Sequence, residues 1–209
     1  SLAGSALVTL ASAATGFALG AVLGVLAGIA LASSRLLERA LYPYTVFLQT
    51  VPIVAIAPLI VIWFGAGPRA VSVSAFIVSV FPVVAGTLAG IKSTDLALLD
   101  LFRLYGARRG QRLSLLQVPS ALPSIVTGLR VASGLAVIGA IVGEFVAGFA
   151  EGNPGLGITI LAAHRQLRTD LLFAAVLGAA ALGLLLFALT NALGWLLLRR
   201  WHPSASGER

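Results

Sequence analysis

The stretch Lys92–Pro123, KSTDLALLDLFRLYGARRGQRLSLLQVPSALP, is a long polar segment in an otherwise apolar chain. Five of the fourteen lysines and arginines lie in it: Lys92, Arg103, Arg108, Arg109 and Arg112. A helical run, Asp95–Tyr105, leads to Gly106, and a second run, Arg108–Val118, leads to Pro119. Because glycine and proline commonly end helices, we predict a loop that is folded into two short helices and docks on a partner.

The composition around this loop is that of an integral membrane protein. Hydrophobic residues make up 59% of the 209 residues, charged residues only 10%, and the mean hydropathy is +1.03. A soluble domain carries roughly a quarter of charged residues. Apolar and polar residues do not alternate with period two, which disfavours a transmembrane barrel. We therefore predict an all-α membrane protein, a polytopic helical bundle.

Five apolar runs are each long enough to cross about 30 Å of hydrocarbon at about 1.5 Å per residue. They are Ser5–Ala32, Pro43–Phe64, Val71–Ile91, Leu122–Val146 and Leu171–Leu198. The first run is too long for a signal-peptide core and has no basic start, and residue 1 is Ser, so we expect one more span upstream. Residues 158–168 are predicted as an amphipathic helix, too short and too charged to span. We expect a single transmembrane domain over residues 1–209.

Basic residues are distributed unequally between the two ends of the expected bundle. Eleven lie on the side of the polar loop, and three lie on the other side, Arg69, Arg165 and Arg168. The positive-inside rule then places the loop and the C-terminus in the cytoplasm. The net charge of +7 thus reflects membrane orientation, and we expect no nucleic-acid partner.

Small and polar residues inside the expected spans suggest how the helices pack and where a solute could pass. Glycines recur every four residues in the first span, at Gly16, Gly20, Gly24 and Gly28, which favours close helix packing over a lipid-facing surface. Prolines interrupt the second span, where QTVP covers residues 49–52. Candidate pathway residues are polar side chains or breaks at mid-span: Gln49, Thr50, Pro52, Ser74, Ser79 and Thr87. The alternative is a structural kink with Gln49 bonded to another helix.

Two ionisable residues lie in the fourth expected span. Arg130 is expected near its start, where it can extend toward the headgroups. Glu144 is expected near its other end, either at the opposite interface or in a functional position.

Residues for catalysis are sparse. The chain has no cysteine and two distant histidines, and it lacks HExxH, GxSxG and Walker A patterns. We therefore expect no enzyme, no metal site and no cofactor in this chain.

The polar loop resembles the signature loop of binding-protein-dependent ABC importer permeases, whose pattern is Glu-Ala-Ala, three residues, Gly, nine residues, Ile, one residue, Leu-Pro. Here Asp100-Leu101-Phe102 precedes Gly106, and Leu116, Gln117 and Val118-Pro119 follow at the matching interval. Leu101-Phe102 departs from the two alanines of the pattern. Further matches resemble the nitrate, sulfonate and taurine branch, which includes permeases for thiamine precursors and riboflavin: Tyr42-Pro43, Pro52 through Pro58-Leu59, Trp63-Phe64-Gly65, Thr87–Gly90, Gly128-Leu129-Arg130, Glu144-Phe145 and Gly155-Leu156-Gly157.

The resemblance implies a type I ABC importer permease core in a bacterial cytoplasmic (inner) membrane. It implies that two permease subunits pair, as a homodimer, and that a solute-binding protein delivers a nitrate, sulfonate, taurine or small heterocycle. ATP and Mg would be bound by a separate ATPase, against which the cytoplasmic loop 92–121 inserts a coupling helix. The resemblance implies that the following residues form the contact with the ATPase: Asp100, Leu101, Phe102, Arg103, Gly106, Ala107, Arg108 and Pro119. An ion-coupled secondary transporter and an intramembrane enzyme remain alternatives.

Overall fold

The computed structural model describes residues 1–147 and 154–198, and all regular structure within these ranges is helical. The helices are α1 (Leu2–Ser33), α2 (Arg35–Thr50), α3 (Ile53–Phe64), α4 (Pro68–Lys92), α5 (Leu96–Leu104), α6 (Arg109–Arg112), the π-helical turn η1 (Leu113–Gln117), α7 (Val118–Ala147), α8 (Leu156–Arg165) and α9 (Thr169–Leu198). The all-helical membrane fold class is thereby confirmed. Residues 148–153 and the C-terminal residues 199–209, with Arg199, Arg200 and His202, lie outside the described residues.

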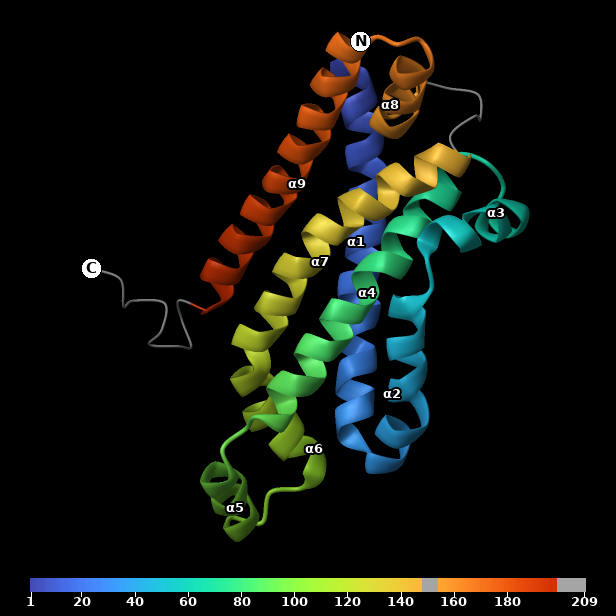
Figure 1. Ribbon diagram of the computed structural model, residues 1–209. Helices are drawn as coiled ribbons and strands as arrows, with labels where there is room; N and C mark the ends of the chain where they lie inside the picture. Colours follow the sequence, from blue (N-terminus) through green and yellow to red (C-terminus); the bar gives the residue numbers. More distant parts are fainter. Residues whose placement is uncertain (148–153, 199–209) are drawn as a thin grey trace.

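Glycines bring α1 and α4 together along their length. A Cβ added at Gly16 would lie 2.5 Å from the Ser72 carbonyl oxygen, and one at Gly28 would lie 2.5 Å from the Thr87 Cβ. The stripe therefore packs against α4, and α1 and α4 run in the same direction (Figure 1). The predicted packing role of the four-residue glycine repeat is confirmed, because contacts this short leave no room for a side chain.

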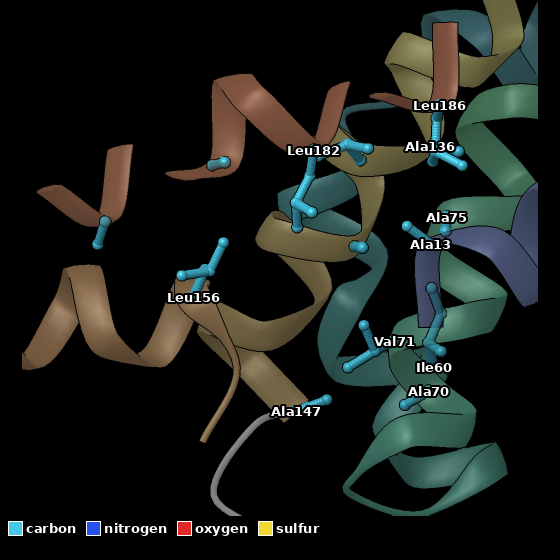
Figure 2. Packing of buried hydrophobic residues seen from close by; sticks show 14 residues of the cluster. Ala13, Ile60, Ala70, Val71, Ala75, Ala136, Ala147, Leu156, Leu182 and Leu186 are labelled. Atoms are coloured by element: carbon cyan, nitrogen blue, oxygen red, sulfur yellow. The ribbon is translucent and has the colours of Figure 1, made fainter. Parts of the chain in front are cut away.

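Helix α7 returns through the bundle antiparallel to α4. A Cβ at Gly128 would meet the Pro82 carbonyl oxygen at 2.6 Å, and one at Gly139 would meet the Ala75 Cα at 2.9 Å. Alanines fill the centre of the largest buried cluster, where Figure 2 shows Ala13, Ala75 and Ala136 lying where α1, α4 and α7 approach. The three helices thus form a closely packed unit made largely from small residues.

Within residues 1–147 and 154–198, four helical segments are long and apolar enough to cross a membrane: Leu2–Ser33, Pro68–Lys92, Arg109–Ala147 and Thr169–Leu198. The expected second span, Pro43–Phe64, is not one helix, and that expectation is corrected. The helix breaks because Pro52 lacks an N–H and disfavours helical geometry at the residue before it. Val51 is accordingly extended, with φ −71° and ψ 122°. Since α1 ends at the loop end of the bundle and α4 begins at the other, α2 and α3 together carry the chain back across (Figure 1).

The expected fourth span also begins earlier than Leu122, because α6, η1 and α7 form one continuous helical segment from Arg109 to Ala147. Pro119 does not end the second run of the loop as expected. The Val118 N–H donates to the Leu113 carbonyl in a π turn directly before it. A wider turn rearranges the hydrogen-bond ladder where the proline removes a donor, so the helix continues.

Hydrogen bonds and an ion pair fix the ends of the bundle. At the end away from the loop, the Gly67 N–H donates to the Ala147 carbonyl at 2.8 Å, which joins the α3–α4 turn to the end of α7. At the loop end, Lys92 of α4 pairs with Glu38 of α2. The broken α2–α3 segment is therefore held to the bundle at both of its ends.

Candidate functional site

Helix α5 begins and ends at residues that the sequence marks. The Asp95 carboxylate accepts a hydrogen bond from the Ala97 N–H at 2.8 Å and so caps the first turn. At the other end, Gly106 has φ +71°, and the Ala107 N–H donates to the Phe102 carbonyl at 2.9 Å. This is a glycine C-cap, in which a residue without Cβ takes the left-handed conformation. The turn that the sequence predicts at Gly106 is thus present, with the positive φ that glycine favours.

Helix α5, the first helix of the polar loop, projects from one end of the bundle (Figure 1), and several of its apolar side chains are exposed. Leu104 is 86% exposed and Leu101 is also exposed, whereas Phe102 is half-buried. The Arg103 guanidinium pairs with the Asp100 carboxylate at 2.6 Å, and both side chains are exposed. Exposed leucines beside charged groups are typical of a surface that a partner covers. The coupling roles of these residues stay predictions.

The remaining residues of the predicted coupling set connect α5 to the bundle. Arg108 is exposed, and its N–H donates to the Gln111 Oε1 at 2.8 Å at the start of α6. Ala107 is half-buried in the turn, and Pro119 is half-buried in the first turn of α7. The segment therefore leads from a projecting helix through a glycine turn into the long helix that ends at Ala147.

A cavity of about 580 Å³ lies at the break between α2 and α3. The break contributes Gln49, Thr50 and Pro52, together with their neighbours; α4 contributes Ile77, Val78, Phe81 and Pro82; and α7 contributes Val131 and Leu135. The Thr50 hydroxyl donates to the Phe47 carbonyl at 2.8 Å, and the exposed Gln49 amide makes no hydrogen bond within the described residues. Within the described residues Gln49 is therefore not bonded to another helix, and its role in a solute pathway stays a prediction.

The three hydroxyl residues of α4 that the sequence grouped with this pathway lie elsewhere. Ser74, Ser79 and Thr87 are buried, and none of them lines the cavity. Their hydroxyls donate to the carbonyls of Ala70, Phe76 and Val83 in their own helix, at 3.0, 3.2 and 2.7 Å. The structure therefore separates the predicted pathway residues into a group at the α2–α3 break and a group inside the helix packing.

Glu144 organises the end of the bundle opposite the loop. It is 2% exposed, and its carboxylate accepts from the Thr9 hydroxyl at 2.7 Å and from the Gly157 N–H at 2.6 Å. Thr9 in turn accepts from the Leu156 N–H at 2.8 Å. The first turn of α8 is thus held to α1 and α7 by one buried network. The Glu144 and Gly155–Gly157 motifs stand apart in the sequence, and their contact appears only in the fold. The glycines were the available signal, since any Cβ at Gly155 would overlap the Glu144 carboxylate.

Arg130 lies near the middle of its helical segment rather than near its start. The segment begins at Arg109, well before the expected start of the span, and Gly128 contacts the Pro82 carbonyl near the middle of α4. The Arg130 Nε is buried and has no hydrogen-bond partner within the described residues. Contact of Arg130 with the headgroups stays a prediction.

Comparison with known proteins agrees with this arrangement. Residues 20–203 match the family described as binding-protein-dependent transport system inner membrane component. The chain belongs to this family. A probable ABC transporter permease protein of Haemophilus influenzae is 36% identical over 92% of this chain and 76% of its own length. The formylaminopyrimidine transport permease protein of Halalkalibacterium halodurans is 39% identical over 91% of this chain and 74% of its own.

The fold has a solved counterpart. The MetNI methionine ABC transporter, in an inward-facing conformation, contains a chain that superposes with a TM-score of 0.80 at 17% identity, over 94% of this chain and 95% of that one. Other family members are named as permeases for riboflavin, aliphatic sulfonates, taurine and bicarbonate. The predicted family and the type I importer fold are thus confirmed. The family is one of transporter permeases rather than enzymes, and the described residues contain no group of three or more His, Cys, Asp or Glu side chains that could hold a metal.

Proposed function

We propose that this chain is the membrane-spanning subunit of an ABC importer that moves a small solute inward and takes its energy from a separate ATPase subunit. The observation that carries the proposal is α5, an exposed apolar helix that projects from a membrane bundle and bears the family's signature spacing. ATP and Mg would be bound by the ATPase. A homodimeric pair of these chains and an extracytoplasmic solute-binding protein would complete the transporter.

The physical route for coupling starts at α5 and ends at the cavity. A push on the exposed leucines of α5 reaches the Gly106 turn and then α6, η1 and α7, which form one helical segment. Val131 and Leu135 of α7 line the cavity. Because a helix transmits displacement along its axis, closure of an ATPase pair on α5 would move one wall of the cavity directly. Asp100, Arg103 and Arg108 would orient this contact.

The proposed orientation puts α5 and the C-terminus in the cytoplasm of a bacterial cell. Arg69 and Arg165 lie at the end of the bundle away from the loop, whereas the loop end carries basic residues from the end of α4 to the end of α6: Lys92, Arg103, Arg108, Arg109 and Arg112. This asymmetry favours the loop end inside. The solute-binding protein would then meet the end that α8 and the Glu144 network shape.

For the solute, the cavity favours an uncharged or weakly charged heterocycle over nitrate, a sulfonate or taurine. Its lining contains Gln49, Thr50 and the ring of Phe81, and no charged side chain among the described residues. An anion in a low-dielectric wall needs a cationic or metal partner, whereas a planar heterocycle needs an amide and an aromatic face. The relative named for formylaminopyrimidine supports the same choice.

The test is co-purification with the ATPase. We expect Leu104→Asp, which places a charge on the α5 face, to abolish recovery of the ATPase with the tagged chain. Leu167→Asp is the matched control, since Leu167 is 85% exposed against 86% for Leu104 but lies at the opposite end of the bundle. Equal recovery of the ATPase with both variants would refute the proposed docking role of α5.

A further inference from the structure

A second cavity, of about 390 Å³, lies at the loop end of the bundle, apart from the cavity at the α2–α3 break. Its walls come from the end of α1, from α5 and from the α6–η1 segment, and they include Ser33, Leu99, Arg103, Arg109, Arg112 and Leu113. The pocket therefore joins the projecting helix to the end of a span.

The charge of this pocket has one sign. Among the described residues that line it, three are arginines and none is acidic. Arg103 forms an ion pair with Asp100, whereas Arg109 and Arg112 form no ion pair within the described residues. The Arg112 Nε is buried and has no hydrogen-bond partner there. A buried, charged donor without an acceptor is costly, so the pocket is built for a group that brings negative charge and several acceptor oxygens.

We propose that this pocket binds a phosphate-type oxyanion, supplied either by a phospholipid headgroup or by a free phosphate ester. Arginine presents a planar fork of donors that matches two phosphate oxygens at once. The pocket opens where α1, a membrane span, ends at Ser33, which is the depth at which headgroups lie. Leu99 and Leu113 add apolar wall that suits the glycerol part of a lipid. Basic pockets between spans at the cytoplasmic side are of the kind that binds anionic headgroups.

Occupancy of the site would restrain α5. A phosphate held between Arg103 on α5 and Arg109 and Arg112 on the α6–η1 segment links the two sides of the Gly106 turn. The anion thereby sets the angle at which α5 meets its partner. Binding of the anion itself requires neither a particular solute nor the ATPase, so it can be measured on this chain alone.

Native mass spectrometry of the full chain in detergent tests the proposal. The probes are phosphatidylglycerol and phosphatidylcholine as lipids, and inorganic phosphate and glycerol 3-phosphate as free phosphates. The test variant is Arg109→Gln/Arg112→Gln. The control is Arg35→Gln/Arg39→Gln, which removes the same charge from exposed positions at the same end but outside the pocket. Circular dichroism and size exclusion check that both variants fold.

We expect phosphatidylglycerol adducts on the unaltered chain and on the control, and a loss of affinity of roughly tenfold or more in the test variant, because two charge-assisted contacts are removed. If the free phosphates bind instead, and are lost in the test variant but not in the control, the source of the oxyanion is a soluble phosphate rather than a lipid. The proposal is overturned if neither probe class binds, or if both variants lose binding equally. It is also overturned if no phosphate-containing probe binds and the test variant instead loses the ATPase in the co-purification assay described above. The arginines would then bind a carboxylate of the partner protein.

Discussion

Replacing Gly106 with valine isolates the mechanical role of the turn after α5. Gly106 has φ +71°, and a Cβ added there would meet no described residue of this chain within 4 Å. Steric overlap within the described chain therefore adds nothing, and the effect on the turn itself is backbone strain. A left-handed conformation costs an L-residue about 1–2 kcal/mol, and a β-branched residue more. The native α5–α6 turn should then lose roughly tenfold or more of its population to other conformations.

The assay measures ATP hydrolysis and solute uptake in the same proteoliposomes, which contain this chain and its ATPase. An aminopyrimidine and taurine are both tried, and the solute that the unaltered complex takes up is used for the variants. We expect Gly106→Val to assemble with the ATPase but to move fewer solute molecules per ATP. Gly106→Asn should retain most coupling, since asparagine tolerates the left-handed region. Gly65→Val is the control for backbone strain elsewhere in the chain, because Gly65 has φ +78° and ψ 162°, a conformation nearly restricted to glycine, and its described surroundings at the other end of the bundle are equally open.

Two results would refute the reasoning. The first is unchanged uptake per ATP in Gly106→Val with normal assembly, which would mean that the turn angle does not transmit movement. The second is equal uncoupling in Gly65→Val, which would mean that strain anywhere in the chain has this effect.

Two further predictions concern the bundle itself. Gly16→Ala should lower the thermal midpoint, because the new methyl would overlap a backbone carbonyl of α4, and overpacking costs about 1–3 kcal/mol; Gly183→Ala, in open space on α9, should leave the midpoint unchanged or raise it. Equal midpoints for the two variants would contradict the packing role of the stripe. Glu144→Gln leaves one acceptor oxygen for two donors, the Thr9 hydroxyl and the Gly157 N–H. The unsatisfied group should lower the stability of the network by about 1–3 kcal/mol, and amide hydrogen exchange should become faster at the first turn of α8. Unchanged exchange there would show that the network does not hold α8.

Local chemistry explains why part of this fold could be predicted from the sequence. Hydropathy marks the spans, and a four-residue glycine period predicts one contact face, because residues four apart lie on the same side of a helix. The cap at Asp95 and the turn at Gly106 are also local, since each depends on residues within one helical turn. The signature spacing of the loop is local for the same reason.

Other features depend on partners far away in the chain and could not be predicted. The hydrogen bond between Thr9 and Glu144 joins residues 135 positions apart. Proline gave opposite results in two places: Pro52 breaks a helix, whereas Pro119 follows a π turn that keeps the helix continuous. Hydroxyls such as Ser74 satisfied a carbonyl of their own helix, so polarity within a span did not by itself indicate a solute pathway.

The distribution of side-chain size suggests which parts move during transport. Helices α1, α4 and α7 meet through glycine and alanine, so their backbones are close and sliding between them would produce overlaps. Helix α5 and the α2–α3 segment instead carry large exposed side chains, such as Leu104, Tyr44 and Trp63, and meet the bundle through fewer small residues. The closely packed unit should therefore tilt as one body when α5 is displaced. The cavity lies between α4 and α7, which belong to this unit, and the break at Val51–Pro52, which does not. A tilt of the unit would therefore change the shape of the cavity.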